Sequence, residues 1–371
     1  MADAWVLALD PPSSDPQKKL GGLPLCLRLV LDAQAAGAQA VLVPDPALFT
    51  LVKQLIAERA ASGRGTPVTI PLCSEPPEGA TRVSVPANFV VPRELLKALG
   101  PHGDVDLARA HVPIQTPYGF QPRAVDDPGS LRLAERALFR SLRKTQDGWT
   151  SRHLNRYISL PISRLLAKTP LSPNQISVVV LFIGLFGAWL AAHGDYASCA
   201  AGAFLFQAQS VLDGCDGELS RVTYRGSRLG EWLDTIGDDL TNYAFFGATA
   251  WGLFTKSADS RWLAIGSLGV LAGIAASAIE YRYLVRIGSG DLLRYPLSPE
   301  SASDKQSAFE MIRPLFKRDT FVLLSLLAAL GGVIGVMLIA FTIGALAVLV
   351  SVILAELRMA RERRPRATEL R

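Results

Sequence analysis

The stretch that decides the fold runs from position 213 to position 239 and reads DGCDGELSRVTYRGSRLGEWLDTIGDD. It holds seven acidic residues, and long uncharged apolar runs flank it on both sides. A carboxylate at the centre of a membrane helix costs about 2.5–3.5 kcal/mol, so several together require a cation or a wet cavity that compensates their charge. The stretch therefore predicts a metal-dependent site at a membrane surface.

Apolar runs of membrane length dominate the C-terminal half. They are Leu171–Ala192, Tyr196–Leu212, Leu240–Thr255, Trp262–Ile279 and Thr320–Ala355. The last run is too long for one span of about 20 residues, and the glycines at 331 and 332 divide it. If the third span extends back to the glycine at 230, this half forms an all-α domain of six transmembrane helices.

The basic residues predict how these helices are oriented. Lys and Arg mark the cytoplasmic side of short loops, and they cluster after the second, fourth and sixth predicted spans. Lys256 and Arg261 lie in an opposite loop and are the exception. We therefore expect an integral protein of the cell inner membrane, with the acidic stretch and both termini cytoplasmic. The net charge of +5 fits this orientation and anionic lipid, and we expect no nucleic-acid partner.

The N-terminal half alternates short β-type runs with helical stretches. Strands are expected at Trp5–Leu9, Ala40–Val43, Val68–Pro71 and Asn88–Val91, and helices at Leu25–Ala36 and Ala47–Ala61. Such alternation is typical of a parallel-sheet α/β layer. We expect a soluble α/β domain at residues 1–140, a linker helix at 141–169 and the transmembrane domain at 170–371.

The linker has the pattern of an amphipathic helix. From Trp149 to Ala167, apolar residues recur at helical spacing opposite three arginines, which predicts a helix in the membrane interface. Packing of the same helix on the soluble domain remains the alternative. Pro161 would kink the helix or divide it in two.

The segment Gly21–Val43 resembles the sugar-nucleotide cytidylyltransferase family. Such enzymes cradle phosphates in a glycine-rich loop after the first strand. Here the loop Asp10–Lys19 has no glycine and has three prolines, which lack a backbone donor. The segment Val83–Asn88, where the family carries a metal-binding aspartate, has no acid, although Lys18 or Lys19 could stand for the family's lysine. The resemblance implies a degenerate, non-catalytic nucleotidyltransferase-like domain with a scaffolding or regulatory role.

The acidic stretch contains the pattern D-x2-D-G-x3-R-x8-G-x3-D-x3-D. Asp213 and Asp216 are three positions apart and Asp234 and Asp238 four, so each pair shares one face of a helix. Two helices can thus present four carboxylates to a hard divalent cation such as Mg²⁺ or Mn²⁺. The guanidinium of Arg221 has the geometry to hold a diphosphate.

This pattern resembles the signature of the CDP-alcohol phosphotransferase family, and a serine in place of alanine is the single departure. The resemblance implies transfer of a substituted phosphate from a CDP-alcohol donor to an acceptor hydroxyl, with release of CMP. The residues expected to act are Asp238 as general base, Asp213, Asp216, Asp234 and Asp238 as metal ligands, and Asn174, Gly217, Ser220, Arg221, Ser227 and Gly230 as nucleotide-binding residues. Asn174 also stands in a sequence typical of a helix start with proline at the first position.

The two halves together resemble enzymes that make inositol phosphodiesters, so the acceptor is expected to be a polyol, a polyol phosphate or a lipid. A phosphorylated acceptor requires cations, for which Arg282, Arg286, Lys317 and Arg318 are available. These residues would equally orient the helices and contact anionic membrane lipid. Phospholipid synthesis from CDP-diacylglycerol remains open.

A polytopic cation transporter with the acids as its ion site is the alternative from another class. Transporters often have repeated halves and place acids near mid-membrane, whereas this chain has one acidic cluster near one face. Family resemblance also implies a homodimer, and the small residues Gly266, Gly269 and Gly273 would permit close helix packing.

Overall fold

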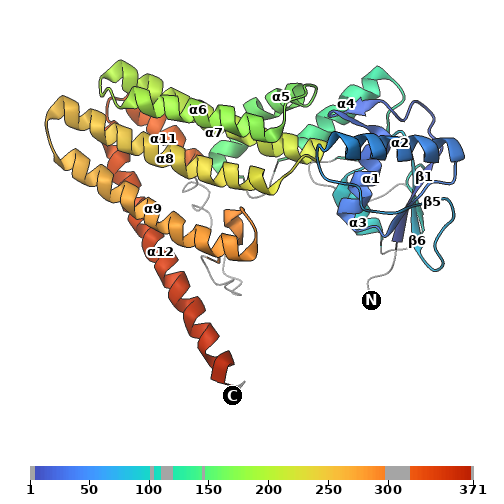
Figure 1. Ribbon diagram of the computed structural model, residues 1–371. Helices are drawn as coiled ribbons and strands as arrows, with labels where there is room; N and C mark the ends of the chain where they lie inside the picture. The colour runs from blue at the N-terminus through green and yellow to red at the C-terminus, as the bar shows by residue number, and fades with distance from the viewer. Residues whose placement is uncertain (1–4, 101–103, 110–119, 144–146, 297–317, 369–371) are drawn as a thin grey trace. The chain divides into compact units, whose positions relative to one another are not determined.

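The protein is seen in a computed structural model that describes residues 5–100, 104–109, 120–143, 147–296 and 318–368 (Figure 1). Its compact units do not follow the order of the chain. Unit 1 combines Met1–Thr145 with Leu160–Leu171 and Gly217–Gly226, and unit 2 combines Gln146–Ser159, Ser172–Asp216 and Ser227–Arg371. Two short pieces of the C-terminal half thus belong to the same compact unit as the N-terminal half.

Unit 1 is built on a parallel five-stranded sheet, which confirms the predicted α/β layer. The strand order is β5-β4-β1-β6-β8, with β1 at Trp5–Asp10, β4 at Ala40–Leu42, β5 at Leu72–Cys73, β6 at Thr81–Pro86 and β8 at Val105–Asp106. Parallel sheets are normally covered on both faces, and the central strand β1 accordingly has both Val6 and Leu7 buried, whose side chains lie on opposite faces. Strand β6, which was not expected, lies beside β1, with Leu7 opposite Val83.

Unit 1 also contains two small sheets, each made of two strands of two residues. Strands β2, Lys19–Leu20, and β3, Leu23–Pro24, pair antiparallel, as do β7, Phe89–Val90, and β9, Arg123–Ala124. The strand expected at Asn88–Val91 therefore exists as β7 but lies outside the main sheet.

The strand expected at Val68–Pro71 is wrong, because the chain there has no strand and β5 begins at Leu72. The reason is a side chain from the neighbouring helix. Gln34 Oε1 accepts the backbone N–H groups of Thr69, at 2.7 Å, and Ile70, at 3.1 Å, so these amides do not enter the sheet.

The helices of unit 1 begin and end at residues of known preference. They are α1, Leu25–Ala36, α2, Pro46–Ser62, α3, Arg93–Leu99, and α4, Pro128–Arg140. The expected helices α1 and α2 are confirmed. Asp45 caps α2 by accepting the N–H of Leu48 at 2.7 Å, and Asp127 forms a capping box with Ser130 at the start of α4.

The carboxyl group of Asp32 on α1 makes the stability of unit 1 depend on pH. Burial raises the pKa of Asp32 from 3.8 to about 6, which means that the fold favours the protonated form. The stabilisation from protonated Asp32 is full below about pH 4 and is lost as the pH rises through about 6, up to a ceiling of roughly 3 kcal/mol. We expect the melting temperature to fall between about pH 4 and pH 7 more steeply in the wild type than in Asp32→Asn, which cannot ionise. Equal slopes would contradict this.

Unit 2 is helical, and it contains helices where the six spans were expected. They are α6, Pro173–Ala191, α7, Tyr196–Thr223, α8, Arg228–Ser257, α9, Arg261–Ile287, α11, Arg318–Leu330, and α12, Ile334–Thr368, the end of α7 belonging to unit 1. The short 3₁₀ helix η4, Leu292–Arg294, follows α9. Helix α11 ends at Leu330 and α12 begins at Ile334, so the glycines between them divide the last apolar run as predicted.

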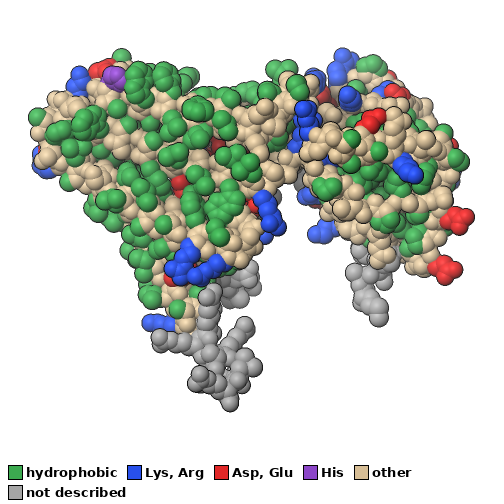
Figure 2. Space-filling view, viewed as in Figure 1, with side chains coloured by type: hydrophobic (Ala, Val, Ile, Leu, Met, Phe, Trp, Pro, Cys, Tyr) green, Lys and Arg blue, Asp and Glu red, His purple; other side chains and the backbone are tan. Residues whose placement is uncertain are grey.

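Three helices among the described residues are long and apolar enough to cross a membrane, namely Pro173–Ala191, Arg261–Ile287 and Ile334–Arg361. The protein is thus an integral membrane protein with helical spans, and six spans remain a prediction. Figure 2 shows hydrophobic side chains spread over the visible face of these helices. Phe182 and Leu271 are each 65% exposed and Ile343 is 64% exposed, as expected for side chains that face lipid.

The linker forms the π-helical turn η3, Ser151–Asn155, and helix α5, Arg156–Leu166. Pro161 lies inside α5 and does not divide it. The helix is turned with its polar residues inward, because Ser159 and Ser163 are buried. Ile158 and Leu165 are exposed, so the apolar side of α5 is left uncovered within the described residues.

Candidate metal and nucleotide site

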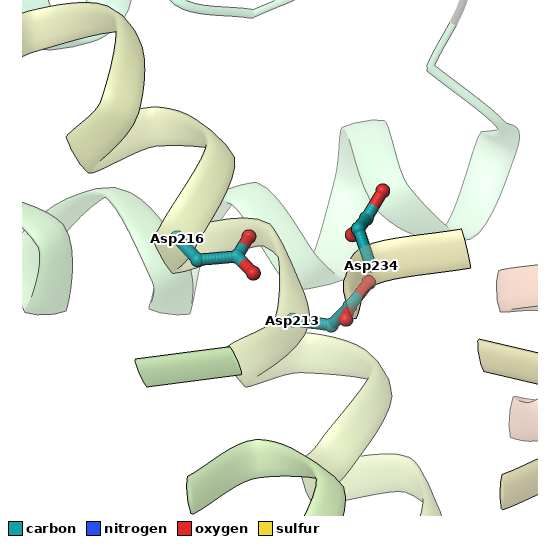
Figure 3. A group of neighbouring side chains, drawn as sticks. All are labelled: Asp213, Asp216 and Asp234. Carbon is teal, nitrogen blue, oxygen red and sulfur yellow. The ribbon is translucent and has the colours of Figure 1, made fainter. Parts of the chain in front are cut away.

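Three carboxylates from two helices of unit 2 converge, and we call them the aspartate triad: Asp213 and Asp216 on α7, and Asp234 on α8. One oxygen from each lies within 4.8 Å of the others. Figure 3 shows Asp213 and Asp216 projecting from one helix and Asp234 from another. Asp216 is buried and Asp234 exposed, so the triad is open on the side of α8. An all-oxygen donor set of this kind fits a hard divalent cation.

Ser177 on α6 fixes one member of the triad. Its hydroxyl donates a hydrogen bond to Asp216 Oδ2. A hydrogen bond of this kind holds a carboxylate in the orientation in which it can bind a metal ion. Nothing in the sequence pattern marks this serine, which stands about one turn after Asn174 on α6.

Asp238, one turn after Asp234, is paired with a cation instead of belonging to the triad. Arg318 Nη1 lies 2.7 Å from Asp238 Oδ1 and 3.9 Å from Asp213 Oδ2. The contact with Asp238 is an ion pair without hydrogen-bond geometry, and the buried Oδ1 accepts no hydrogen bond. Oδ1 of Asp238 is therefore held by the charge of Arg318 alone and not by a hydrogen bond.

The guanidinium of Arg318 is held by neutral groups as well. Its Nη2 donates to Gln209 Oε1 at 2.9 Å and to Thr241 Oγ1 at 3.3 Å, and its Nε donates to Asn242 Oδ1 at 3.2 Å. These partners come from α7 and α8, while Arg318 is the first residue of α11. A guanidinium fixed in this way next to carboxylates presents a planar fork that matches a phosphate group.

Three of the residues predicted to bind the nucleotide meet at the start of α8. Ser227 is the N-cap of this helix, and its Oγ accepts the N–H of Gly230 at 3.0 Å. The same hydroxyl donates to Asn174 Oδ1, from the first turn of α6, at 3.3 Å. The helix start expected around Asn174 is present too, with Ser172 as N-cap and a proline at the first position. A helix N-terminus with these groups suits an anionic ligand.

Gly230 leaves no room for a side chain. A Cβ there would lie 2.9 Å from Asn174 Oδ1 and 3.2 Å from Ser227 Oγ. We therefore expect Gly230→Ala to push Asn174 away from Ser227 and to weaken CMP binding by about 10-fold, measured by calorimetric titration. Gly237→Ala on the same helix is the control, because a Cβ there meets nothing within 4 Å. Unchanged CMP affinity in Gly230→Ala would contradict the proposed contact.

The other predicted site residues are distributed differently. Arg221 is exposed near the end of α7, and its Nη1 lies 3.3 Å from where a Cβ of Gly217 would be. Ser220 is half-buried in the same turn. Arg282 and Arg286 are exposed near the end of α9, and neither forms an ion pair with the aspartates among the described residues. Lys317 lies outside the described residues.

Two further acids of the stretch, Glu231 and Asp239, have structural partners. Asp239 accepts hydrogen bonds from Ser277 Oγ at 2.5 Å and from Tyr281 OH at 2.7 Å. Glu231 Oε2 accepts the N–H of Gly290 at 3.2 Å. These two acids thus tie α8 to α9 and to the loop that follows it.

Polar groups of the proline-rich loop, residues 10–19, form hydrogen bonds with other residues of unit 1. The side chain of Asn88 accepts the N–H of Ser13 at 3.3 Å and donates to Asp126 Oδ1 at 2.8 Å. Lys18 Nζ donates to the carbonyl oxygen of Asp126 at 2.6 Å. The lysine and one of the few donors of this loop therefore already have protein partners.

Comparison with known proteins adds sequence relationships to this geometry. Residues 170–353 match the family model described as CDP-alcohol phosphatidyltransferase. A "Bifunctional IPC transferase and DIPP synthase" from Thermococcus kodakarensis is 33% identical over 187 residues, which are 49% of this chain and 41% of that protein. A protein of the same name from Aquifex aeolicus is 36% identical over 164 residues, 44% of this chain and 37% of that one.

A "Phosphatidylinositol phosphate synthase" from Corynebacterium glutamicum is 29% identical over 124 residues, 33% of this chain and 53% of that protein. The chain thus spans about two fifths of the length of the two bifunctional relatives and about half of the third.

Proposed function

Because the chain belongs, through residues 170–353, to the CDP-alcohol phosphatidyltransferase family, we propose that it transfers a substituted phosphate from a CDP-alcohol to an acceptor hydroxyl and releases CMP. The observation that carries the proposal is the aspartate triad, in which α7 and α8 bring three carboxylate oxygens within 4.8 Å of one another. The triad belongs to the same sequence pattern as Gly230, which lies at the start of α8.

Asp213, Asp216 and Asp234 would hold Mg²⁺ or Mn²⁺, since all three offer oxygen ligands. Such an ion, when bound, supplies positive charge that neutralises the diphosphate and stabilises the leaving CMP. The hydroxyl of Ser177 keeps Asp216 turned toward its two neighbours. Asp238 was expected to be a further metal ligand. We keep this role for it in the proposal, because its Oδ1 accepts no hydrogen bond.

Asp238 is proposed as the general base. The acceptor oxygen forms a bond to the phosphorus that carries the alcohol, the bridging P–O bond to CMP breaks, and the hydroxyl proton passes to Asp238 Oδ1. A carboxylate paired with arginine is a poor base, because the positive charge favours its ionised form. Arg318 must therefore move away from Asp238 before Asp238 accepts the proton. An acceptor that carries a phosphate would offer the guanidinium another anion and would thereby free the base.

The nucleotide would bind at Asn174, Ser227 and Gly230, with Gly217, Ser220 and Arg221 at the end of α7. Support comes from the hydrogen bonds that join the first three residues at a helix N-terminus. Arg221, which is exposed, would meet the diphosphate by its guanidinium.

For the acceptor we propose a polyol phosphate of the inositol type, with Arg318 as its phosphate ligand and Arg282, Arg286 and Lys317 as further cations. The name of the Corynebacterium relative, which includes inositol phosphate, supports this class. The donor would be CDP-inositol or, if the chain makes phospholipid, CDP-diacylglycerol.

The N-terminal domain is proposed to be non-catalytic. The contacts of Lys18 and Asn88 within the proline-rich loop support this, because they use groups that a nucleotide would need. Helix α5 would lie in the membrane interface, since Ile158 and Leu165 are exposed while its serines are buried. We further propose a homodimer in the cell inner membrane with the site and both termini cytoplasmic.

The test is CMP release by the purified chain in detergent, from CDP-inositol and from CDP-diacylglycerol, with Mg²⁺ or Mn²⁺ and a panel of polyol, polyol phosphate and lipid acceptors. Metal-dependent release of CMP supports the proposal, and the productive donor separates soluble phosphodiester synthesis from lipid synthesis. No release from any pair, by protein that binds Mn²⁺, would overturn it. Cation flux into proteoliposomes would then test the transporter alternative.

A further inference from the structure

The short connection between α7 and α8, Val222–Gly226, joins Arg221 to Ser227, two residues of the proposed nucleotide site. Its packing is unexpected for a loop between two membrane helices. The segment Gly217–Gly226 belongs to unit 1, with the N-terminal α/β layer, whereas the rest of α7 belongs to unit 2. The end of α7 is thus part of the soluble fold.

Arg28 on α1 makes the first contact with this connection. It is only 3% exposed, and its Nη2 donates to the carbonyl oxygen of Val222 at 2.7 Å and to that of Leu20 at 2.8 Å. The last carbonyls of a helix have no partner within the helix and carry partial negative charge. A buried guanidinium at this place therefore acts as a C-terminal cap supplied from another helix.

Arg59 on α2 donates hydrogen bonds to the next two carbonyl oxygens of the chain. Its Nη2 donates to Tyr224 O at 2.7 Å and to Thr223 O at 3.4 Å, while its Nε donates to Thr66 O at 3.0 Å. The N–H of Thr66 also donates to Tyr224 O, at 2.6 Å. Two arginines of the α/β layer thus bind three consecutive carbonyls, from Val222 to Tyr224.

Tyr224 has a backbone conformation that needs such support. Its φ is +53°, in the left-handed region that tyrosine rarely adopts. Its hydroxyl donates to Asp32 Oδ1 on α1, and its ring packs against the buried cluster of Leu23, Leu27 and Leu31. The turn that directs the chain out of α7 is therefore held at a strained residue by contacts with the N-terminal half.

We propose that the N-terminal α/β domain is a positioning device for the nucleotide site. Arg28, Arg59 and Asp32 hold residues 222–224 of the connection in one conformation, and this fixes how Arg221, the residue before them on α7, is presented to the cytidine diphosphate group. None of the three is a catalytic residue. The inference rests on the proposed function, and it assigns the degenerate domain a task that requires no nucleotide of its own.

The test compares Arg59→Met and Tyr224→Phe with Gln34→Met in the purified chain. Arg59→Met removes the donors to the connection, and Tyr224→Phe removes the contact with Asp32. Gln34 is the matched control, because it hydrogen-bonds the backbone at Pro67, Thr69 and Ile70 of the same domain and not the connection. The measurements are KM for donor and for acceptor, kcat, CMP affinity, and hydrogen exchange of residues 222–230.

We expect Arg59→Met to raise the donor KM and the Kd of CMP by about 10-fold and to leave the acceptor KM unchanged. Hydrogen exchange should be faster at 222–230 and unchanged in α7 before Asp213. Tyr224→Phe should act in the same direction, Arg59→Lys should recover part of the loss, and Gln34→Met should resemble the wild type.

The proposal is overturned if donor KM and CMP affinity stay unchanged. It is also overturned if kcat falls only in step with the fraction of folded protein while both KM values stay constant, since the contacts would then be purely structural. A wild type that turns over no CDP-alcohol but binds CMP, more weakly in Arg59→Met, would refute the proposed reaction and support the positioning role. A wild type that does not bind CMP refutes both.

Discussion

Asp238→Asn is expected to lower the rate of CMP release by about 10³-fold at saturating substrates, within the range for loss of a general base. Asparagine has nearly the size of aspartate but cannot take up the proton of the acceptor hydroxyl. At Oδ1, which accepts no hydrogen bond in the folded protein, the replacement removes only the ion pair with Arg318. The loss should therefore appear in kcat, with the protein still folded.

Asp239→Asn is the matched control for this experiment. The two acids are neighbours on α8, but Asp239 is held by Ser277 and Tyr281 and lies outside the signature. Its replacement is expected to leave kcat within a few-fold of the wild type. If the two variants lose activity equally, or if Asp238→Asn stays active, Asp238 is not the base.

Asp213→Asn is expected to lower activity by at least about 100-fold and to shift the Mg²⁺ dependence to higher concentration, because one carboxylate of the aspartate triad is lost. The independent measurement is Mn²⁺ binding by electron paramagnetic resonance, which requires no turnover. The variant should bind Mn²⁺ more weakly than the wild type.

Glu231→Gln provides the comparison for the metal experiment. This glutamate lies at the start of α8, close in sequence to Asp234, but it bonds the N–H of Gly290 and is not a member of the triad. We expect its Mn²⁺ affinity to match the wild type. Identical Mn²⁺ titrations for Asp213→Asn and the wild type would remove Asp213 from the metal site.

Helical spacing was sufficient to predict which acids share a face. Asp213 and Asp216 fall on one side of α7 because they are three positions apart, and this is a local property of the chain. The bounds of α1 were predictable for the same reason. The pairing of Asp238 with Arg318 was not, since the two residues are far apart in sequence and meet only when α11 packs beside α8.

The errors in the sheet also have local causes. Val83 and Val85 are buried and alternate with Arg82 and Ser84, so the period-2 pattern of strand β6 is present in the sequence although no strand was predicted there. At Thr69 and Ile70, a side-chain amide from α1 replaced the expected strand partner. No propensity scale contains such a contact between distant residues.

The left-handed turn at Tyr224 gave no signal in the sequence either. A glycine would have indicated it, whereas a tyrosine indicates ordinary backbone. The carbonyl groups at the end of α7 are capped by Arg28 and Arg59, which lie 194 and 165 residues before the residues that they bind. A local sequence pattern cannot indicate such a cap.

The composition of unit 1 from three stretches of chain has a consequence for biosynthesis. A ribosome completes Met1–Thr145 long before it reaches Gly217–Gly226, and α6 and most of α7 are made in between. Arg28 and Asp32 therefore lack their partners, Val222 and Tyr224, until α7 has been synthesised. Folding of unit 1 thus cannot be completed before the first two long helices of the C-terminal half have been made.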